Sequence, residues 1–273
     1  MEIQDSVAII TGAGSGIGEA LAQSFAAAGA RVVVGDIDAA AADGTARRIT
    51  ERGQHAVAVC ADAGVDTDIR TMIDVAATRF GPVDIYVANA GVSGPPGLGM
   101  SEHDWDLVLD VNVRAHVRAA KLVLPAWIQR GHGHFVSTAS AAGLLTQIGA
   151  AAYTVSKHAV VGFAEWLAIT YGDDGIGVSC VCPLGVNTAL LRSAFESPDA
   201  TQRLAASAIS RAAEVIEPEL VADMAVDAVR NGTFLVLPHP QVVDLYRQKG
   251  ADYDRWISGM RHFQRSLPTI CGA

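Results

Sequence analysis

The sequence has few charged residues, and lysine is the scarcest of them. Only 18% of the 273 residues are charged, and lysine occurs at just three positions, Lys121, Lys157 and Lys249. Aspartate and glutamate outnumber lysine and arginine by 29 to 20, so the formal net charge is −9. A nucleic-acid-binding protein needs a basic stripe that neutralises phosphates, and this sequence has none. We therefore expect no nucleic-acid partner, and each lysine becomes informative.

Patterns typical of disulfides, metal sites and membrane segments are also missing. The cysteines, at Cys60, Cys180, Cys182 and Cys271, lack the paired spacing of a zinc site or a disulfide framework. His132 and His134 lack an evident third ligand, so a turn explains this pair better than a metal site. No apolar run reaches the roughly 18 residues of a membrane span, and the first residues lack the basic segment of a signal peptide. We expect a cytoplasmic protein with no metal ion and no membrane partner.

Half of the residues are hydrophobic, and they fall into short β-branched runs that alternate with amphipathic stretches. The runs are almost continuously apolar, which is typical of parallel strands covered on both faces. The expected strands are residues 7–10, 31–35, 56–60, 83–88, 134–137, 177–181 and 234–237. The expected helices are residues 16–28, 39–52, 66–79, 102–130, 152–171 and 218–231.

This alternation predicts an α/β fold: a doubly wound (Rossmann) parallel sheet of about seven strands with helices on both faces. We expect a single dinucleotide-binding and catalytic domain over residues 1–238. Residues 184–212 interrupt the alternation and are expected to form a substrate lid, because long insertions in compact domains are usually functional. Residues 239–273 carry four aromatic side chains, which predicts an extension packed on the domain or on a neighbouring subunit.

A glycine-rich turn, TGAGSGIG at residues 11–18, follows the first expected strand. Glycines permit positive φ angles and close approach of the backbone, and a helix N-terminus offers free N–H donors. These are the requirements for holding a pyrophosphate. The spacing is G-x-x-x-G-x-G rather than the general G-x-G-x-x-G. The alternative is an ordinary tight loop between a strand and a helix.

Asp36 ends the second expected strand. An acidic residue here accepts hydrogen bonds from an adenosine ribose and repels a 2′-phosphate. Two unit charges about 4 Å apart interact by roughly 4 kcal/mol at an effective dielectric near 20. Ser15 and Ile37 stand where a basic residue could have bound a phosphate. We therefore expect NAD rather than NADP, the alternative being that Asp36 or Asp38 only caps the next helix.

Tyr153 and Lys157 are four residues apart on one expected helix, so their side chains project from the same face. A tyrosine of pKa about 10 must approach 7 to act as a general base, a shift of roughly 4 kcal/mol. A neighbouring ammonium and an oxidised nicotinamide both favour the phenolate. The alternative is a surface contact between two side chains on one helix.

Ser140 and Asn112 complete the candidate catalytic set. Ser140 follows the fifth expected strand, at the edge where doubly wound sheets bind ligands, and can hold a substrate oxygen. Ser137 and Thr138 are local competitors for that role. Asn112 lies inside an expected helix, where asparagine is mildly unfavourable, and it could hold a water molecule. The alternative is an asparagine bonded only to its own surroundings.

Together these motifs resemble the short-chain dehydrogenase/reductase family in its compact single-domain form, over about residues 5–237. The pieces occur in the family's order: TGAGSGIG at 11–18, Asp36, Asp62, NAG at 89–91, Asn112, Ser140, YTVSK at 153–157 and PLGVNT at 183–188. The sequence departs from the family at Leu184, where glycine is frequent, and at Ala88, where a first asparagine is frequent.

The resemblance implies NAD as the cofactor and assigns roles to individual residues. The cofactor would be bound by Gly12, Ser15, Gly16, Ile17, Gly18, Asp36, Asp62, Ala63, Asn89, Ala90, Gly91, Tyr153, Lys157, Val186 and Thr188. Tyr153 would be the catalytic acid/base, and Lys157 would bind the nicotinamide ribose and depress the pKa of Tyr153. Ser140 would orient the substrate oxygen, and Asn112 would anchor a relay water. A homotetramer or homodimer is also implied.

The expected walls of the substrate site, residues 93–100, 144–148 and 190–195, are mainly apolar, and Arg192 is the one residue in them that could bind a carboxylate or phosphate. We expect substrate contacts from Ser140, Gln147, Leu184 and Leu191. The leading hypothesis is an NAD-dependent oxidoreductase that interconverts a fairly hydrophobic secondary alcohol and its ketone. One alternative is an NADPH-dependent 3-oxoacyl-thioester or carbonyl reductase, which would use the same residues. A non-catalytic dinucleotide-binding regulator is disfavoured because the catalytic set is intact.

Overall fold

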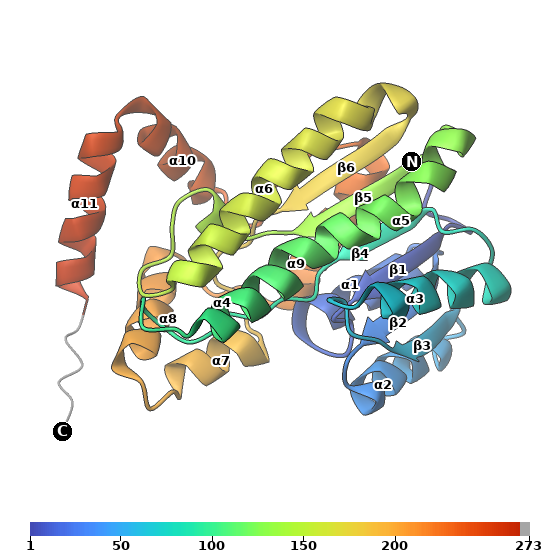
Figure 1. The fold of residues 1–273 in the computed structure, drawn as a ribbon, viewed down its shortest axis with the longest axis horizontal. Helices are drawn as coiled ribbons and strands as arrows, with labels where there is room; N and C mark the ends of the chain where they lie inside the picture. Colours follow the sequence, from blue (N-terminus) through green and yellow to red (C-terminus); the bar gives the residue numbers. More distant parts are fainter. Residues whose placement is uncertain (268–273) are drawn as a thin grey trace.

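The computed structural model describes residues 1–267 and confirms the doubly wound α/β fold in one domain (Figure 1). Its parallel strands form one seven-stranded sheet in the order β3-β2-β1-β4-β5-β6-β7. The strands are β1 (Val7–Thr11), β2 (Arg31–Asp36), β3 (Ala56–Cys60), β4 (Ile85–Ala88), β5 (Gly133–Thr138), β6 (Ile176–Val181) and β7 (Leu235–Val236). Every residue of β1, β4 and β5 is buried, which explains why these segments are apolar without alternation.

Helices cover both faces of the sheet (Figure 1). On one face, α1 (Gly16–Ala27), α2 (Ala39–Thr50) and α9 (Pro218–Asn231) share an apolar core. On the other face, α3 (Asp66–Arg79), α5 (Ala115–Arg130) and α6 (Ala151–Tyr171) share a second core. Successive strands are added outward from β1 to β3 on one side of the sheet and from β4 to β7 on the other. The carboxyl ends of the neighbouring strands β1 and β4 therefore flank the crevice where such sheets bind ligands.

The expected helix at 102–130 is helical throughout but not uniform. It consists of α4 (Glu102–Leu109), a π-helical turn over Asp110–Arg114 and then α5. Such turns are rare and occur frequently at functional sites. This one contains Asn112, and nothing in the sequence pattern predicted it.

Residues 184–212 fold into two short helices, α7 (Ala189–Phe195) and α8 (Ala200–Ala212). Both have a side chain at the N-cap, because Thr188 accepts from the Leu191 N–H and Asp199 accepts from the first turn of α8. Figure 1 shows them together at one end of the sheet. The segment is thus folded and lies next to the cleft described below.

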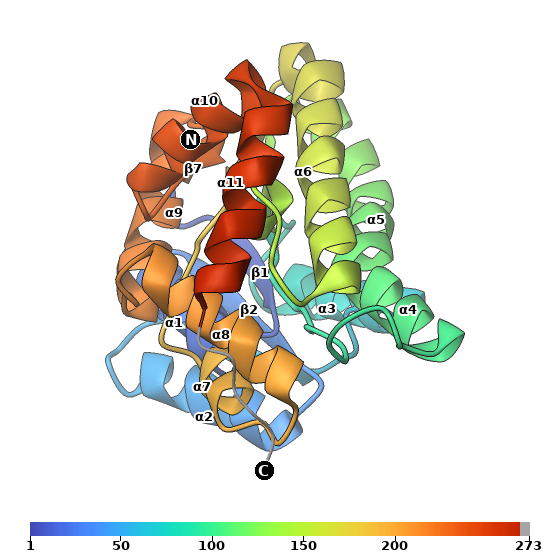
Figure 2. The ribbon, with the colours of Figure 1, turned by 90° about the vertical axis from the view of Figure 1, so that its left-hand side faces the viewer.

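The C-terminal extension forms α10 (Gln241–Ala251) and α11 (Tyr253–Ser266). Val242 of α10 is fully buried, whereas α11 has no buried residue. Figure 1 shows α11 standing apart from the sheet on the side of α8, and Figure 2, which views that side, shows it in front of the sheet. Residues 268–273, which end the expected extension and include Cys271, lie outside the described residues. Among the helices of residues 1–267, none is long and apolar enough to cross a membrane.

Candidate active site

A cleft of about 510 Å³ opens at the carboxyl edge of the sheet. Asp36, Ile37 and Asp62 line one end, the glycine-rich turn and Tyr153 line the middle, and residues of α7 and α8 line the far end. Every residue to which the sequence analysis assigned a cofactor, catalytic or substrate contact lines this cleft except Asn112. The expected walls at residues 93–100, 144–148 and 190–195 line it only in part, through Ser93, Gly94, Pro96, Gln147, Leu190, Leu191 and Ala194. Segments distant in the sequence are therefore brought together in one continuous space.

The glycine-rich turn is shaped for a closely approaching ligand. Gly12 and Gly16 have φ angles of 62° and 55°, which L side chains rarely adopt. A side chain at Gly18 would collide with the Gly12 carbonyl oxygen. The Asn89 side-chain amide holds the turn by donating to the Thr11 carbonyl oxygen at 3.0 Å. At the start of α1, Ser15 makes no side-chain cap, so backbone N–H groups there remain for an anion.

Asp36 holds one end of this turn. Its Oδ2 accepts from the Gly14 N–H at 2.8 Å, and its Oδ1 accepts from the Asp38 N–H at 2.9 Å. Asp38, not Asp36, caps α2 by accepting from Ala40 and Ala41. The capping role considered for Asp36 thus belongs to its neighbour, and the Asp36 carboxylate faces the cleft.

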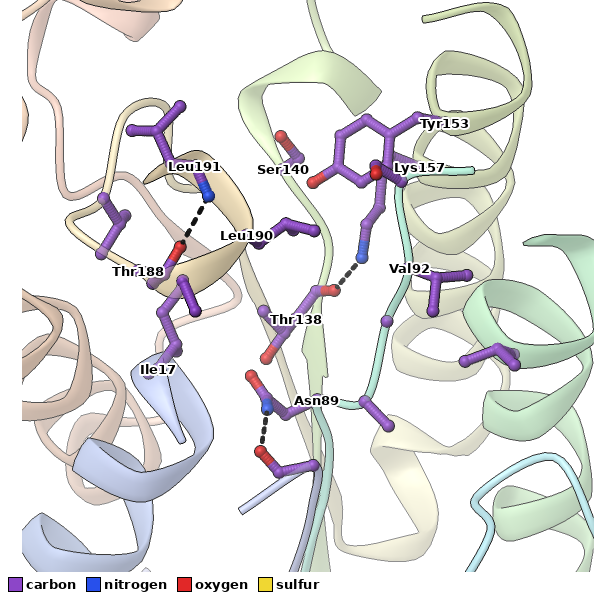
Figure 3. Close-up of a pocket in the computed structure, with 18 of the residues that line it drawn as sticks. Ile17, Asn89, Val92, Thr138, Ser140, Tyr153, Lys157, Thr188, Leu190 and Leu191 are labelled. Carbon is purple, nitrogen blue, oxygen red and sulfur yellow. Dashed lines mark hydrogen bonds between the residues drawn. The ribbon is translucent and has the colours of Figure 1, made fainter. Parts of the chain in front are cut away.

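Ser140, Tyr153 and Lys157 meet in the middle of the cleft (Figure 3). The Lys157 ammonium is buried, donates to the Thr138 carbonyl oxygen at 2.8 Å and lies 5.6 Å from the centroid of the Tyr153 ring. Burial lowers the pKa of Lys157 to about 8. The Ser140 hydroxyl accepts from the Ala142 N–H at 3.1 Å and donates to the Pro183 carbonyl oxygen at 3.4 Å. These contacts fix Ser140 at the start of a short 3₁₀ turn.

The protein's own groups do not bring the pKa of Tyr153 toward 7. The Tyr153 side chain is half-buried. Desolvation of its hydroxyl raises the pKa of Tyr153 above its ordinary value, and the hydrogen bond with Ser140 opposes that rise. The pKa depression expected from Lys157 alone is therefore not seen.

Asn112 is buried away from the cleft. Its Oδ1 accepts from the Val92 N–H at 2.8 Å, and its Nδ2 donates to the Val92 carbonyl oxygen at 2.8 Å and to the Ser156 hydroxyl at 3.0 Å. The side chain thus ties the loop after Gly91 to α6. The side chain is therefore bonded to its own surroundings, and the role of Asn112 in anchoring a relay water stays a prediction.

The far end of the cleft is apolar. Leu184 and Leu191 line it as expected. Gln147 also lines it, and its amide nitrogen donates to the Ala205 carbonyl oxygen of α8 at 3.1 Å. Arg192 instead donates to Asn187 at 2.7 Å and does not line the cleft. Lys157 is the one cationic side chain among the described residues that line the cleft.

Sequence reasoning missed part of this wall. Leu107 and Val111, from α4 and the π-helical turn, face the cleft, as does one side of α8. The residues of α8 are Gln202, Ala205, Ala206 and Ile209. Their i, i+3, i+4, i+7 spacing is the signal that could have identified this face.

The residues of the cleft fit a dinucleotide. An acidic side chain stands at one end, and the glycine-rich turn presents a helix N-terminus. In the middle, the Thr138 hydroxyl oxygen is buried without a hydrogen-bond partner and lines the cleft. A buried unpaired hydroxyl of this kind is costly unless a ligand bonds to it.

The family model for short chain dehydrogenases matches residues 6–199. Over 196 residues the chain is 37% identical to 1-deoxy-11-beta-hydroxypentalenate dehydrogenase of Streptomyces exfoliatus, covering 70% of this chain and 71% of that protein. Over 206 residues it is 35% identical to (+)-borneol dehydrogenase 2 of Salvia officinalis, covering 72% of this chain and 70% of that protein.

A solved structure of a short chain dehydrogenase/reductase from Burkholderia phymatum, in complex with NAD, is also similar. Its TM-score is 0.84 at 30% sequence identity, and the match covers 93% of this chain and 96% of that one. These similarities of sequence and structure agree with what the glycine-rich turn and the cluster of Ser140, Tyr153 and Lys157 indicate. The chain belongs to the short-chain dehydrogenase family of oxidoreductases, which act on CH–OH groups.

Proposed function

We propose that this protein is an NAD-dependent dehydrogenase that interconverts a fairly hydrophobic secondary alcohol and its ketone. The observation that carries the proposal is the order of groups along the cleft. Asp36 lies at one end, Ser140, Tyr153 and Lys157 lie in the middle, and apolar side chains line the other end. A cofactor and an apolar alcohol can therefore share one space, with the proton-transfer groups between them.

Each catalytic side chain has one task in this proposal. Ser140 donates a hydrogen bond to the substrate oxygen and orients it beside Tyr153. Tyr153 accepts the hydroxyl proton during oxidation and returns it during reduction. Lys157 binds the ribose hydroxyls, and its charge favours the phenolate. When bound, an oxidised dinucleotide would supply the hydride acceptor and a positive charge near Tyr153, which favours the phenolate.

Asp36 supports NAD as the cofactor. Its carboxylate is fixed by two backbone N–H groups, so it cannot easily move away from a 2′-phosphate. Its neighbours in the cleft, Ile37 and Asp62, offer no cation that could bind such a phosphate. An NADPH-dependent reductase would need such a cation, so the residues at this end of the cleft favour an NAD-dependent dehydrogenase.

The far end of the cleft supports an apolar substrate. No arginine lines it within residues 1–267, so a carboxylate or phosphate on the substrate would have no cationic partner there. The two relatives described above are named as dehydrogenases of a pentalenate and of borneol. A compact polycyclic alcohol is consistent with both observations.

We also propose that the protein is a homo-oligomer that pairs through α6. Val155, Trp166 and Ile169 form one exposed apolar stripe on that helix, with Ile169 84% exposed. Trp166 stacks on Phe163 and makes an edge contact with Tyr171. A stripe of large apolar side chains on a rigid helix is typical of an interface. Sedimentation as a monomer at micromolar concentration would refute this.

The test is an initial-rate assay of NAD reduction with matched sets of alcohols. We expect turnover of bicyclic terpenoid or steroid alcohols and none of sugar alcohols or 2-hydroxy acids. Tyr153→Phe should lower kcat by at least about a hundredfold, because it removes the proton acceptor, while leaving NADH binding intact. Turnover confined to anionic or sugar substrates would contradict the substrate class, and full activity in Tyr153→Phe would contradict the mechanism.

A further inference from the structure

Lys249 is a buried cation that the proposed chemistry does not use. It lies on α10 of the C-terminal extension and is 6% exposed. No carboxylate of residues 1–267 forms an ion pair with it. Burying an unpaired ammonium costs free energy unless hydrogen bonds compensate it. The contacts of Lys249 therefore indicate which part of the structure it stabilises.

Those contacts reach two elements that carry catalytic groups. The ammonium donates to the Leu144 carbonyl oxygen at 2.6 Å and lies 3.4 Å from Nε2 of His158. Leu144 ends the 3₁₀ turn (Ala141–Gly143) whose N-cap is Ser140. His158 follows Lys157 on α6. Lys249 thus joins the Ser140 turn to the helix that bears Tyr153 and Lys157.

The protonation of His158 suits this link. Its Nδ1 is 2.9 Å from the Thr154 carbonyl oxygen. A carbonyl only accepts, so Nδ1 carries the proton and Nε2 offers a lone pair to the Lys249 ammonium. The ring of Tyr253, the first residue of α11, lies 5.6 Å from the same ammonium.

The loop held by Lys249 is strained. Thr146 has a φ angle of 97°, which is unfavourable for a β-branched residue. Such a backbone persists only where surrounding contacts hold it. From the α6 side, the Thr154 hydroxyl accepts from the Gln147 N–H at 3.0 Å. From the opposite side, Lys249 holds Leu144. The loop is therefore fixed between α6 and α10 (Figure 1).

We infer that Lys249 is a positioning residue that holds the 3₁₀ turn after Ser140 against α6, so that the Ser140 hydroxyl keeps its position relative to Tyr153. This inference rests on the proposed dehydrogenase function. It makes the C-terminal extension part of the catalytic architecture, although none of its described residues lines the cleft. Displacing a reacting group by about 1 Å can lower a rate up to a hundredfold. The effect of losing Lys249 should thus appear in kcat rather than in cofactor binding.

The test compares Lys249→Met with Lys249→Arg and with the control Arg247→Met. Methionine keeps the length and removes the charge, arginine restores a donor, and Arg247 lies on the same helix with its side chain exposed. We expect Lys249→Met to lower kcat about tenfold, with the Kd for NADH unchanged within about twofold. Lys249→Arg should recover most of the loss, and Arg247→Met should match the wild type.

Wild-type kcat in Lys249→Met would overturn the inference, as would a loss that Lys249→Arg does not recover. A fall in NADH affinity or melting temperature that parallels the fall in kcat would also overturn it, because it would indicate general destabilisation. Hydrogen exchange tests the same point without any substrate. In Lys249→Met the amides of residues 141–150 should exchange faster, with Arg247→Met unchanged. If the wild type oxidises no alcohol, the proposed function fails, and the exchange rates still decide the role of Lys249.

Discussion

The charge of Asp36 should decide which dinucleotide the protein binds, and Asp36→Asn tests this directly. Asparagine keeps a carbonyl oxygen that can accept from the Gly14 N–H, the bond that Asp36 makes at 2.8 Å. The glycine-rich turn should therefore keep its shape. The variant removes the negative charge that would face a 2′-phosphate. It also loses the bond from the Asp38 N–H, because the asparagine amide nitrogen cannot accept it.

The size of the effect follows from the geometry of the site. A carboxylate and a phosphate about 4 Å apart repel by roughly 4 kcal/mol at an effective dielectric near 20. Because the adenosine end is open to solvent, we expect about 2 to 4 kcal/mol, or roughly a 30-fold to 1000-fold preference for NADH. Fluorescence titrations with NADH and with NADPH measure this ratio. In Asp36→Asn the preference should fall below about tenfold, mainly through tighter NADPH binding.

Asp38→Asn is the matched control. Asp38 lies two residues away and caps α2, a role that asparagine fills equally well. It does not line the cleft, so the ratio of the two affinities should not change. Equal wild-type affinities for NADH and NADPH would refute the reasoning, as would an unchanged ratio in Asp36→Asn.

Two further predictions concern buried histidines and a glycine of the structure around the site. Burial lowers the pKa of His116 to about 3 and that of His134 to about 4, so below pH 6.5 the unfolded chain binds more protons than the folded one. The free energy of unfolding should therefore fall by about 2 kcal/mol per histidine between pH 6.5 and 5. Urea titrations at the two pH values measure this fall. It should be smaller in His116→Gln than in the wild type, and the control His55→Gln should show the same fall as the wild type. In Gly18→Ala the added methyl group would collide with the Gly12 carbonyl oxygen, so NADH affinity should drop at least about tenfold; wild-type affinity in calorimetry would show that the turn tolerates it.

Local patterns in the sequence were sufficient to predict the sheet and the cofactor end of the cleft. The glycine-rich turn and Asp36 each lie at a strand end, so one strand assignment places them at the same edge. The i, i+4 spacing of Tyr153 and Lys157 likewise fixes their common face once the helix is recognised. These features depend on short stretches of chain, which periodicity and turn chemistry describe.

Features that depend on contacts between distant segments could not be predicted. Asn112 does not line the cleft, because its side chain bonds to Val92, 20 residues earlier. Lys249 meets Leu144 across 105 residues. In each case a partner that no local pattern identifies determines where the side chain lies.

Transfer of the carbinol hydrogen to NAD tests the central claim most directly. The protein is mixed with NAD and a bicyclic secondary alcohol that carries deuterium on its carbinol carbon, and the reduced cofactor is examined by mass spectrometry. The account predicts deuterium in NADH from the wild type, and a yield at least about a hundredfold lower from Tyr153→Phe over the same time. Deuterium released into water, or an equal yield from Tyr153→Phe, would contradict it.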